Sequence, residues 1–166
     1  MKEKSGEHPF GDSGQLVLFV LFLLIWVVDS FFLRISTFLS DDISLLIRLV
    51  ILSLALIAAV YLIRSGHVVV SHGQCPSGVV STGAFQYVRH PLYLGSIMFY
   101  LGLAVSTASL FSLVLVVLIF IFYNFIASYE EKLLEGRFHE EYRNYKKRTG
   151  KWVPLIGRVN KKILSK

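Results

Sequence analysis

Two polar clusters, one at each end of a long apolar run, contain the residue types that can do chemistry in this chain. The stretch "YVRHPLYLG" places Arg89, His90 and Tyr93 around a proline, just where the apolar run begins. Glu130 and Glu131 follow the end of the same run. A guanidinium, an imidazole, a phenol and two carboxylates can bind a polar ligand and stabilise charge. A bare membrane hairpin would need none of them.

Each of these residues also has a plain structural explanation. Arg89 can be a topogenic charge, His90 a helix-entry residue and Tyr93 an interfacial aromatic. The two glutamates can begin a solvated helix at the membrane surface. Their grouping around a first-turn proline, with Gly95 one turn into the helix, favours a shared site over separate structural roles.

Three other kinds of site have little support in the sequence. None of the histidines has the spacing of a known zinc-ligand pair such as H-E-x-x-H, so we expect no metal. No nucleophile elbow indicates a Ser-His-Asp hydrolase, and no G-x-G-x-x-G follows a strand to indicate a Rossmann site. A single cysteine, Cys75, excludes an intramolecular disulfide and a cysteine-only zinc site.

The elements that position the two clusters are predicted to be transmembrane helices of one domain. The chain has 166 residues, of which 54% are hydrophobic and 17% charged, and this is too apolar for a soluble domain. The apolar residues form three long blocks, at Leu16–Leu33, Ile43–Ile63 and Leu92–Ile126. Blocks of this length indicate helices that cross a bilayer.

The third block is too long for one span and is predicted to be a hairpin. The polar cluster at 106–109 is the expected turn, between a span at 92–105 and another at 110–126. The fold class is therefore all-α, a bundle of four transmembrane helices. The third span would be only about 21 Å long, so "YVRHP" is expected to lie at bilayer depth against other protein.

The basic residues predict the orientation of the chain. Of the 17 lysines and arginines, 15 lie on the side of the termini and the long loop, and only Arg34 and Arg48 lie opposite. Both termini and the site are therefore expected in the cytoplasm. Topology and attraction to anionic headgroups of membrane lipids explain the net charge of +6, so no nucleic-acid partner is expected.

The segments outside the spans have different compositions. A glycine-rich loop is expected at 64–91, and long ordered loops are often functional. The tail reads as an amphipathic helix, because Leu134, Phe138, Tyr142 and Tyr145 recur at helical spacing. The predicted divisions are a leader at 1–15, the first two spans at 16–63, the loop at 64–91, a helical hairpin at 92–127, the C-terminal helix at 128–154 and a tail at 155–166.

Two quoted segments together resemble a known family. The segment "VVSTGAFQYVRHPLYLG", followed after a hairpin by "EEKLLEGRFHEEYRNYKKRTGKWVP", resembles the isoprenylcysteine carboxyl methyltransferases and the related phospholipid methyltransferases. The likeness extends from about His67 to Pro154. It is specific, because an R-H-P-x-Y-x-G box, a hairpin, an E-E pair and an F-x-x-x-Y-x-x-Y tail recur in order.

This resemblance implies an integral membrane methyltransferase that uses S-adenosylmethionine on a lipophilic or lipid acceptor. Glu130 would hold a polar group of the cofactor, and Arg89 and Glu131 are the candidates for a catalytic role. Arg89 could equally brace the loop by pairing with either glutamate. The cofactor-binding residues implied are Ser77, Gly78, Val79, Val80, Phe85, His90, Pro91, Leu92, Tyr93, Glu130, Tyr142 and Tyr145.

Three positions depart from the pattern of the carboxyl methyltransferases. Phe85 replaces a tyrosine that contacts the cofactor, and Val70 replaces a glutamine. Ile126 stands where those enzymes have an arginine associated with the substrate, so an anionic carboxylate acceptor loses its partner. The acceptor therefore stays open among phospholipid amines, thiols and other small lipophilic nucleophiles. The low span count also leaves open a homo-oligomer that completes the acceptor pocket.

A rival of another class is a non-catalytic membrane scaffold or a small transporter subunit of the same shape. A transporter would be expected to place ionisable groups near the bilayer centre. The predicted spans hold only Asp29 and Arg48, and both are expected near the far interface. The sequence therefore favours the enzyme, and binding of the cofactor separates the two hypotheses.

Overall fold

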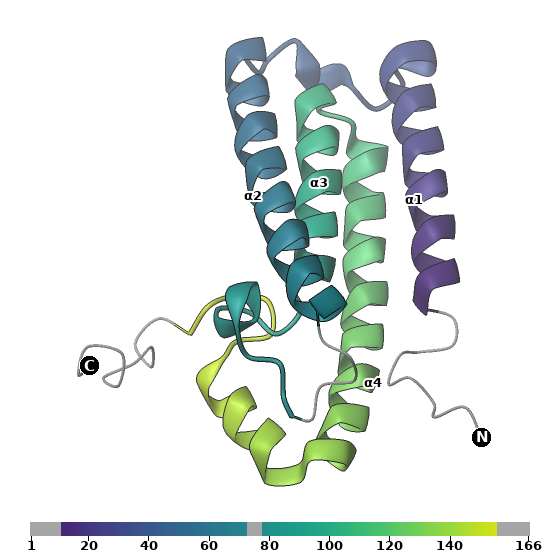
Figure 1. Ribbon diagram of the computed structural model, residues 1–166. Helices are drawn as coiled ribbons and strands as arrows, with labels where there is room; N and C mark the ends of the chain where they lie inside the picture. The colour runs from purple at the N-terminus through teal and green to yellow at the C-terminus, as the bar shows by residue number, and fades with distance from the viewer. Residues whose placement is uncertain (1–10, 73–77, 156–166) are drawn as a thin grey trace.

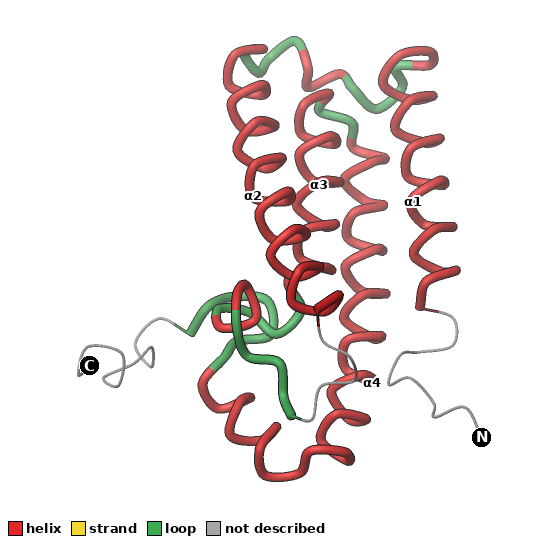
Figure 2. Tube along the Cα trace, in the orientation of Figure 1, coloured by secondary structure: helices red, strands yellow, loops and turns green. Residues whose placement is uncertain are grey.

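The computed structural model describes residues 11–72 and 78–155, and their regular structure is helical throughout (Figures 1 and 2). The predicted all-α class is confirmed. The one β-type pairing within these ranges is an isolated bridge between Val88 and Gly150. The elements in chain order are α1 (Gly11–Val27), the π-helix η1 (Val28–Leu33), the 3-10 helix η2 (Phe38–Ser40), α2 (Leu45–His72), the 3-10 helix η3 (Gly83–Gln86), α3 (Pro91–Thr107) and α4 (Leu110–Arg148).

Three helical segments in the described ranges are long and apolar enough to cross a membrane, at Ser13–Leu33, Leu45–His67 and Leu110–Arg148. Between them α3 is a shorter apolar helix of 17 residues. The outward faces carry large exposed apolar side chains such as Leu46, which is 71% exposed. Such faces suit lipid rather than water. The helices stand side by side in one bundle (Figure 1).

Close contact between α2 and α3 fixes the start of α3. A Cβ atom added at Gly95 would lie 2.7 Å from Ile63 Cγ1 and 3.1 Å from the carbonyl oxygen of Ala59. At Gly102 it would lie 2.9 Å from the Cβ of Ala55. Small residues at a helix interface let two backbones approach closely, which is how membrane helices commonly pack.

Two glycine-to-alanine variants are expected to change stability in opposite directions. Gly95→Ala should destabilise the protein by roughly 1–3 kcal/mol because it overpacks the α2–α3 contact. Gly136→Ala should stabilise it by about 0.5–1 kcal/mol, because Gly136 is helical and nothing lies within 4 Å of an added Cβ. Thermal unfolding in one detergent measures both, and equal shifts of the same sign would contradict the packing argument.

The first span and the α3–α4 turn meet at one end of the bundle. The first span is α1 with η1, as predicted to Leu33, although α1 begins at Gly11, inside the expected leader. The buried carboxylate of Asp29 in η1 accepts hydrogen bonds from the amide of Ser36 (3.0 Å) and the hydroxyl of Ser109 (2.6 Å). The predicted turn is confirmed, since α3 ends at Thr107 and α4 begins three residues later.

The second span is longer than the sequence predicted. It continues past Ile63 to His72, so the first part of the expected loop at 64–91 is helical. Gly66 suggested a break there, but one glycine inside a helix costs only about 1 kcal/mol. A Cβ at Gly66 would lie 3.1 Å from Leu92 Cγ, so the helix continues where it packs against α3.

The predicted C-terminal helix at 128–154 is the continuation of α4 rather than a separate helix. α4 extends from Leu110 to Arg148, with non-helical backbone angles at His139 (φ 44°, ψ −117°). The chain after this kink turns back beneath the ends of α2 and α3 (Figure 1). Neither proline nor glycine stands at the kink, so the residue pattern predicts none.

Ion pairs join the two halves of α4 across the kink. The Nε of Arg143 lies 2.9 Å from Glu135 Oε1, and the Nζ of Lys146 lies 3.2 Å from Glu135 Oε2. Arg143 and Lys146 follow the kink, whereas Glu135 precedes it. Pairs this exposed to solvent are screened and add little to stability.

Candidate active site

The proline at the start of α3 sets the direction of the first cluster. Pro91 occupies the first turn of α3 and is buried, and His90 precedes it as the cap residue. Proline suits this position because its fixed φ matches a helix and its missing amide hydrogen has no intrahelical acceptor there. Arg89, His90 and Tyr93 are thereby placed at the end of α3 beside α4, where the two glutamates lie.

The second cluster contacts the first through both of its carboxylates. The Nε of Arg89 donates a hydrogen bond of 2.8 Å to Glu131 Oε1, and His90 Nε2 lies 3.2 Å from the same oxygen. The hydroxyl of Tyr93 donates a hydrogen bond of 2.6 Å to Glu130 Oε1. His90 Nδ1 lies 3.7 Å from the other oxygen of Glu130. The imidazole therefore stands between two carboxylates that come from one turn of α4.

Aromatic rings continue this cluster in both directions. The rings of His90 and Tyr93 are stacked with their centroids 5.8 Å apart, and those of Tyr93 and Tyr123 are stacked at 5.1 Å. The ring of Trp152 lies 5.9 Å from that of His90 and is tilted by 41° to it. A row of ring faces thus extends from the C-terminal segment into the bundle core, where Tyr123 is buried.

Arg89 also fastens the C-terminal segment to the loop. Its backbone amide donates a hydrogen bond of 2.9 Å to the carbonyl oxygen of Gly150, and its guanidinium donates to the carbonyl oxygen of Thr149. The Val88–Gly150 bridge lies beside these contacts. The hydrogen bonds of Arg89 in the described chain thus go to backbone carbonyl oxygens and to Glu131.

The second half of α4 holds the loop before α3. Glu141 Oε1 accepts a hydrogen bond of 2.8 Å from the amide of Val79, and a Cβ at Gly78 would lie 2.9 Å from the same oxygen. The hydroxyl of Tyr145 donates a hydrogen bond of 2.6 Å to the carbonyl oxygen of Phe85. The loop and the Glu141 side chain are therefore in close contact at Gly78, and a larger residue there would have to displace the carboxylate.

Tyr142 and Tyr145 line the inner face of the second half of α4. They are 2% and 4% exposed, and their ring centroids are 5.9 Å apart. Burial raises the pKa of both phenols, and the charge of Glu131 raises that of Tyr142 further. Both side chains are thus neutral hydrogen-bond donors at physiological pH.

The C-terminal segment returns to the first half of α4. The Nζ of Lys151 donates hydrogen bonds to Asn124 Oδ1 (2.9 Å) and to the hydroxyl of Ser128 (2.7 Å). The indole of Trp152 donates to the same Asn124 oxygen at 3.1 Å. These contacts place Trp152 over the His90 ring, so the segment covers one side of the polar cluster.

Glu131 lies beyond the apolar part of α4, and its carboxylate is stabilised as an anion. Burial acts to raise its pKa, but hydrogen bonds from His90 and Arg89 and the charge of Arg89 outweigh burial and lower the pKa to about 2. Lys146 Nζ lies 3.7 Å from its second oxygen. A carboxylate held in this way keeps its charge across the physiological range.

Acid is expected to destabilise the protein through Glu131. The folded-state pKa of about 2 is below the ordinary value of 4.5, so this group stabilises the fold above pH 4.5 and loses that effect as the pH falls toward 2. The full effect is about 3 kcal/mol. Thermal unfolding of the wild type and of Glu131→Gln between pH 6 and pH 3 measures it. The wild type should lose stability more steeply, and parallel curves would exclude Glu131 as the group responsible.

The structure brings together most of the residues that the sequence pointed to. Pro91 and Leu92 lie against Gly66 of α2, and Ser77 lies outside the described residues. Among the residues described, no group of histidine, cysteine and acidic side chains could hold a metal ion. Those in direct contact within the polar cluster are Arg89, His90, Tyr93, Glu130 and Glu131, and Tyr142 and Tyr145 are close enough for the charge of Glu131 to affect their pKa. Gly78, Val79 and Phe85 contact the second half of α4, and Val80 follows Val79 in the loop.

Three contributors were not predicted from the sequence. Glu141 fixes the loop, Tyr123 extends the stack of rings and Trp152 covers His90. In the sequence, Tyr123 lies within an apolar span, and Glu141 is one of many charged residues in a predicted solvated helix. Neither pattern indicates a role in the site. Trp152 lies in the segment "GKWVP", whose mixture of glycine, lysine and proline was the one signal of a fixed turn.

Comparison of the sequence with those of known proteins identifies a family. Residues 44–141 match the phospholipid methyltransferase family. Protein-S-isoprenylcysteine O-methyltransferase of Saccharomyces cerevisiae is 33% identical over 93 residues, which are 54% of this chain and 38% of the yeast protein. The aligned region is thus well under half of that relative's length. No solved structure matches the chain.

The matched region and the polar cluster coincide. The region begins just before α2 and ends in the second half of α4, so it contains both the Arg89–Tyr93 segment and the two glutamates. It also covers more than half of the chain. The chain therefore belongs to the phospholipid methyltransferase family.

Proposed function

We propose that this protein is an integral membrane methyltransferase that transfers a methyl group from S-adenosylmethionine to a lipophilic acceptor. One observation carries the proposal: the two clusters of the family pattern meet at the end of an apolar bundle, where Tyr93 donates to Glu130 and His90 lies between the carboxylates. A non-catalytic scaffold with the same fold would not need these polar contacts.

The residues present suit the proposed cofactor. S-adenosylmethionine carries a sulfonium, an ammonium, ribose hydroxyls and an aromatic base. Glu130 offers a carboxylate to the hydroxyls or to the ammonium, and the ring faces of His90, Tyr93 and Trp152 suit a cation or a base. The segment at 78–80 is held by α4 through the Val79 amide, and its other peptide groups are proposed to bind the cofactor.

When bound, the cofactor supplies an electrophilic methyl group, and the protein has to position the two reactants and exclude water. Glu130, His90 and Tyr93 bind and orient. Arg89 and Glu131, proposed for catalysis, act by holding the C-terminal segment and the His90 ring in place. No acid or base is required when the acceptor is an anion or a free amine.

The acceptor is proposed to be lipophilic, with no requirement for an anionic group. Ile126 is 1% exposed and brings no charge to the position where the carboxyl methyltransferases have an arginine. The name of the matched family and that of the yeast relative suggest the first acceptors to test, a phospholipid amine and an isoprenylcysteine carboxylate. A lipophilic thiol is the third.

The proposed topology has four spans, with both termini and the site on the cytoplasmic side. α3 has 17 residues, so it is about 25 Å long and can cross a locally thinned bilayer. The excess of basic residues at the end of the bundle that carries the site supports the orientation. A homo-oligomer that completes the acceptor pocket belongs to the same proposal.

Transfer of a labelled methyl group tests the proposal. Membranes containing the protein are incubated with methyl-labelled S-adenosylmethionine and each of the three acceptors, with membranes lacking the protein as control. Label in an extracted lipid product, inhibited by S-adenosylhomocysteine, is the expected result. No transfer, together with no binding of S-adenosylhomocysteine in lipid nanodiscs, would support the scaffold instead.

A further inference from the structure

A second polar site lies at the end of the bundle away from the polar cluster. Seven residues of η1, the η1–α2 connector, α2 and the end of α3 line a pocket of about 160 Å³. They are Ser30, Arg34, Thr37, Ser40, Asp41, Arg48 and Thr107. Since one water needs roughly 10–15 Å³ on this measure, the pocket has room for a tetrahedral oxyanion.

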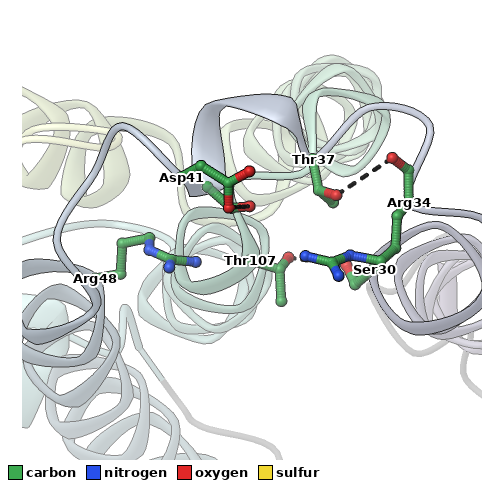
Figure 3. A pocket seen from close by; sticks show the side chains of 7 residues that line it. Ser30, Arg34, Thr37, Asp41, Arg48 and Thr107 are labelled. Atoms are coloured by element: carbon green, nitrogen blue, oxygen red, sulfur yellow. Dashed lines mark hydrogen bonds between the residues drawn. The ribbon is translucent and has the colours of Figure 1, made fainter.

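The two arginines point into this pocket from opposite sides, with Thr107 between them (Figure 3). The Nη1 of Arg48 donates a hydrogen bond of 3.0 Å to the carbonyl oxygen of Ser106, so a neutral group holds this guanidinium. In the described ranges, the guanidinium of Arg34 makes no hydrogen bond, and neither arginine forms an ion pair with a carboxylate. Two guanidinium groups that face one pocket favour an anion between them.

The net charge of the lining residues indicates the charge of the anion. Arg34 and Arg48 bring two positive charges, and Asp41 brings one negative charge. The lining therefore has a net charge of plus one, which matches the single negative charge of a phosphodiester better than the two charges of a phosphomonoester. The hydroxyls of Thr37 and Thr107 donate only long hydrogen bonds, of 3.5 and 3.4 Å, to backbone carbonyl oxygens, so they can turn to donate to the same anion.

The surroundings of the pocket indicate where the phosphodiester comes from. η1 and the connector after it, which supply most of the polar lining residues, also expose Phe32, Ile35 and Phe38, with 76%, 61% and 62% of their surface accessible. Apolar side chains thus flank the pocket at the end of a membrane bundle, as contact with acyl chains requires. We propose that the pocket binds the phosphodiester of a phospholipid headgroup in the leaflet opposite to the polar cluster.

Native mass spectrometry of the full chain tests this proposal. The probes are phosphatidylcholine, diacylglycerol of the same acyl composition, and glycerophosphocholine, which is the headgroup without acyl chains. Arg34→Gln is the decisive variant because the Arg34 side chain makes no bond that holds the described fold together. Arg64→Gln is the matched control, since Arg64 is an exposed arginine toward the other end of α2.

We expect Arg34→Gln to weaken binding of phosphatidylcholine about tenfold, and Arg64→Gln to leave it unchanged. Phosphatidylcholine should also bind more tightly than diacylglycerol. Equal affinities of the two variants, in samples with the same helical content, would overturn the site. Glycerophosphocholine binding as tightly as phosphatidylcholine would overturn the lipid as the source and assign the pocket to a soluble phosphodiester.

Discussion

Replacing Glu130 by alanine is expected to weaken binding of S-adenosylhomocysteine by about tenfold to a hundredfold, because a charge-assisted hydrogen bond contributes roughly 1.5–3 kcal/mol. Glu130 accepts from Tyr93 and faces His90, so its carboxylate is at the centre of the proposed site. Methyl transfer should fall by at least the same factor. Isothermal titration of the purified protein, followed by the labelled assay, measures both quantities.

Glu140→Ala is the matched control for this experiment. Glu140 lies just after the kink, its side chain is 71% exposed, and it pairs with Arg143 at the surface. Its loss removes the same charge from the same helix without touching the polar cluster. Unchanged affinity in Glu130→Ala, or an equal loss in Glu140→Ala, would move the cofactor away from Glu130.

Arg89→Ala is expected to release the C-terminal segment and to destabilise the fold by about 3–5 kcal/mol. Removing one partner of a buried ion pair has this effect because the other charge stays buried without compensation. Here the Glu131 carboxylate would keep only His90 and the more distant Lys146. Hydrogen exchange should rise most strongly in the stretch at 140–152, and thermal unfolding should occur at a lower temperature.

Arg143→Ala provides the comparison for Arg89→Ala. The Arg143 side chain is 53% exposed, and its pairs with Glu135 and Glu140 lie at the surface. Loss of Arg143 should therefore lower the unfolding temperature far less than loss of Arg89 does. If Glu131→Gln is added to Arg89→Ala, part of the lost stability should return, because the unpaired charge is gone. Equal effects of the two arginine variants would contradict the bracing role of Arg89.

The sequence predicts the parts of this fold that depend on local composition. Apolar blocks predict the helices, the small polar residues after Val105 predict the turn, and Pro91 predicts the start of α3. The contact between the two clusters is predictable as well. Both ends of a hairpin come to the same side of a membrane, so residues near position 90 and position 130 had to be close.

What the sequence does not predict depends on contacts between distant segments. His139 adopts a positive φ where the second half of α4 turns back, and Glu141 and Tyr145 hold that half to the loop before α3. No residue at the kink favours that conformation by itself. The continuation of α2 past Ile63 likewise depends on packing against Leu92, which periodicity along one helix cannot reveal.

The length of the unkinked first part of α4 relates the position of Glu130 to the thickness of the bilayer. Glu130 follows the first residue of α4, Leu110, by 20 residues without a kink between them. At about 1.5 Å per residue this distance is about 30 Å, the thickness of a typical hydrocarbon core. In the proposed topology, the carboxylate therefore lies at the interface of a bilayer of about that thickness. Thicker, sterol-rich membranes would draw it into hydrocarbon, so the lipid composition of the host membrane sets the depth of the proposed chemistry.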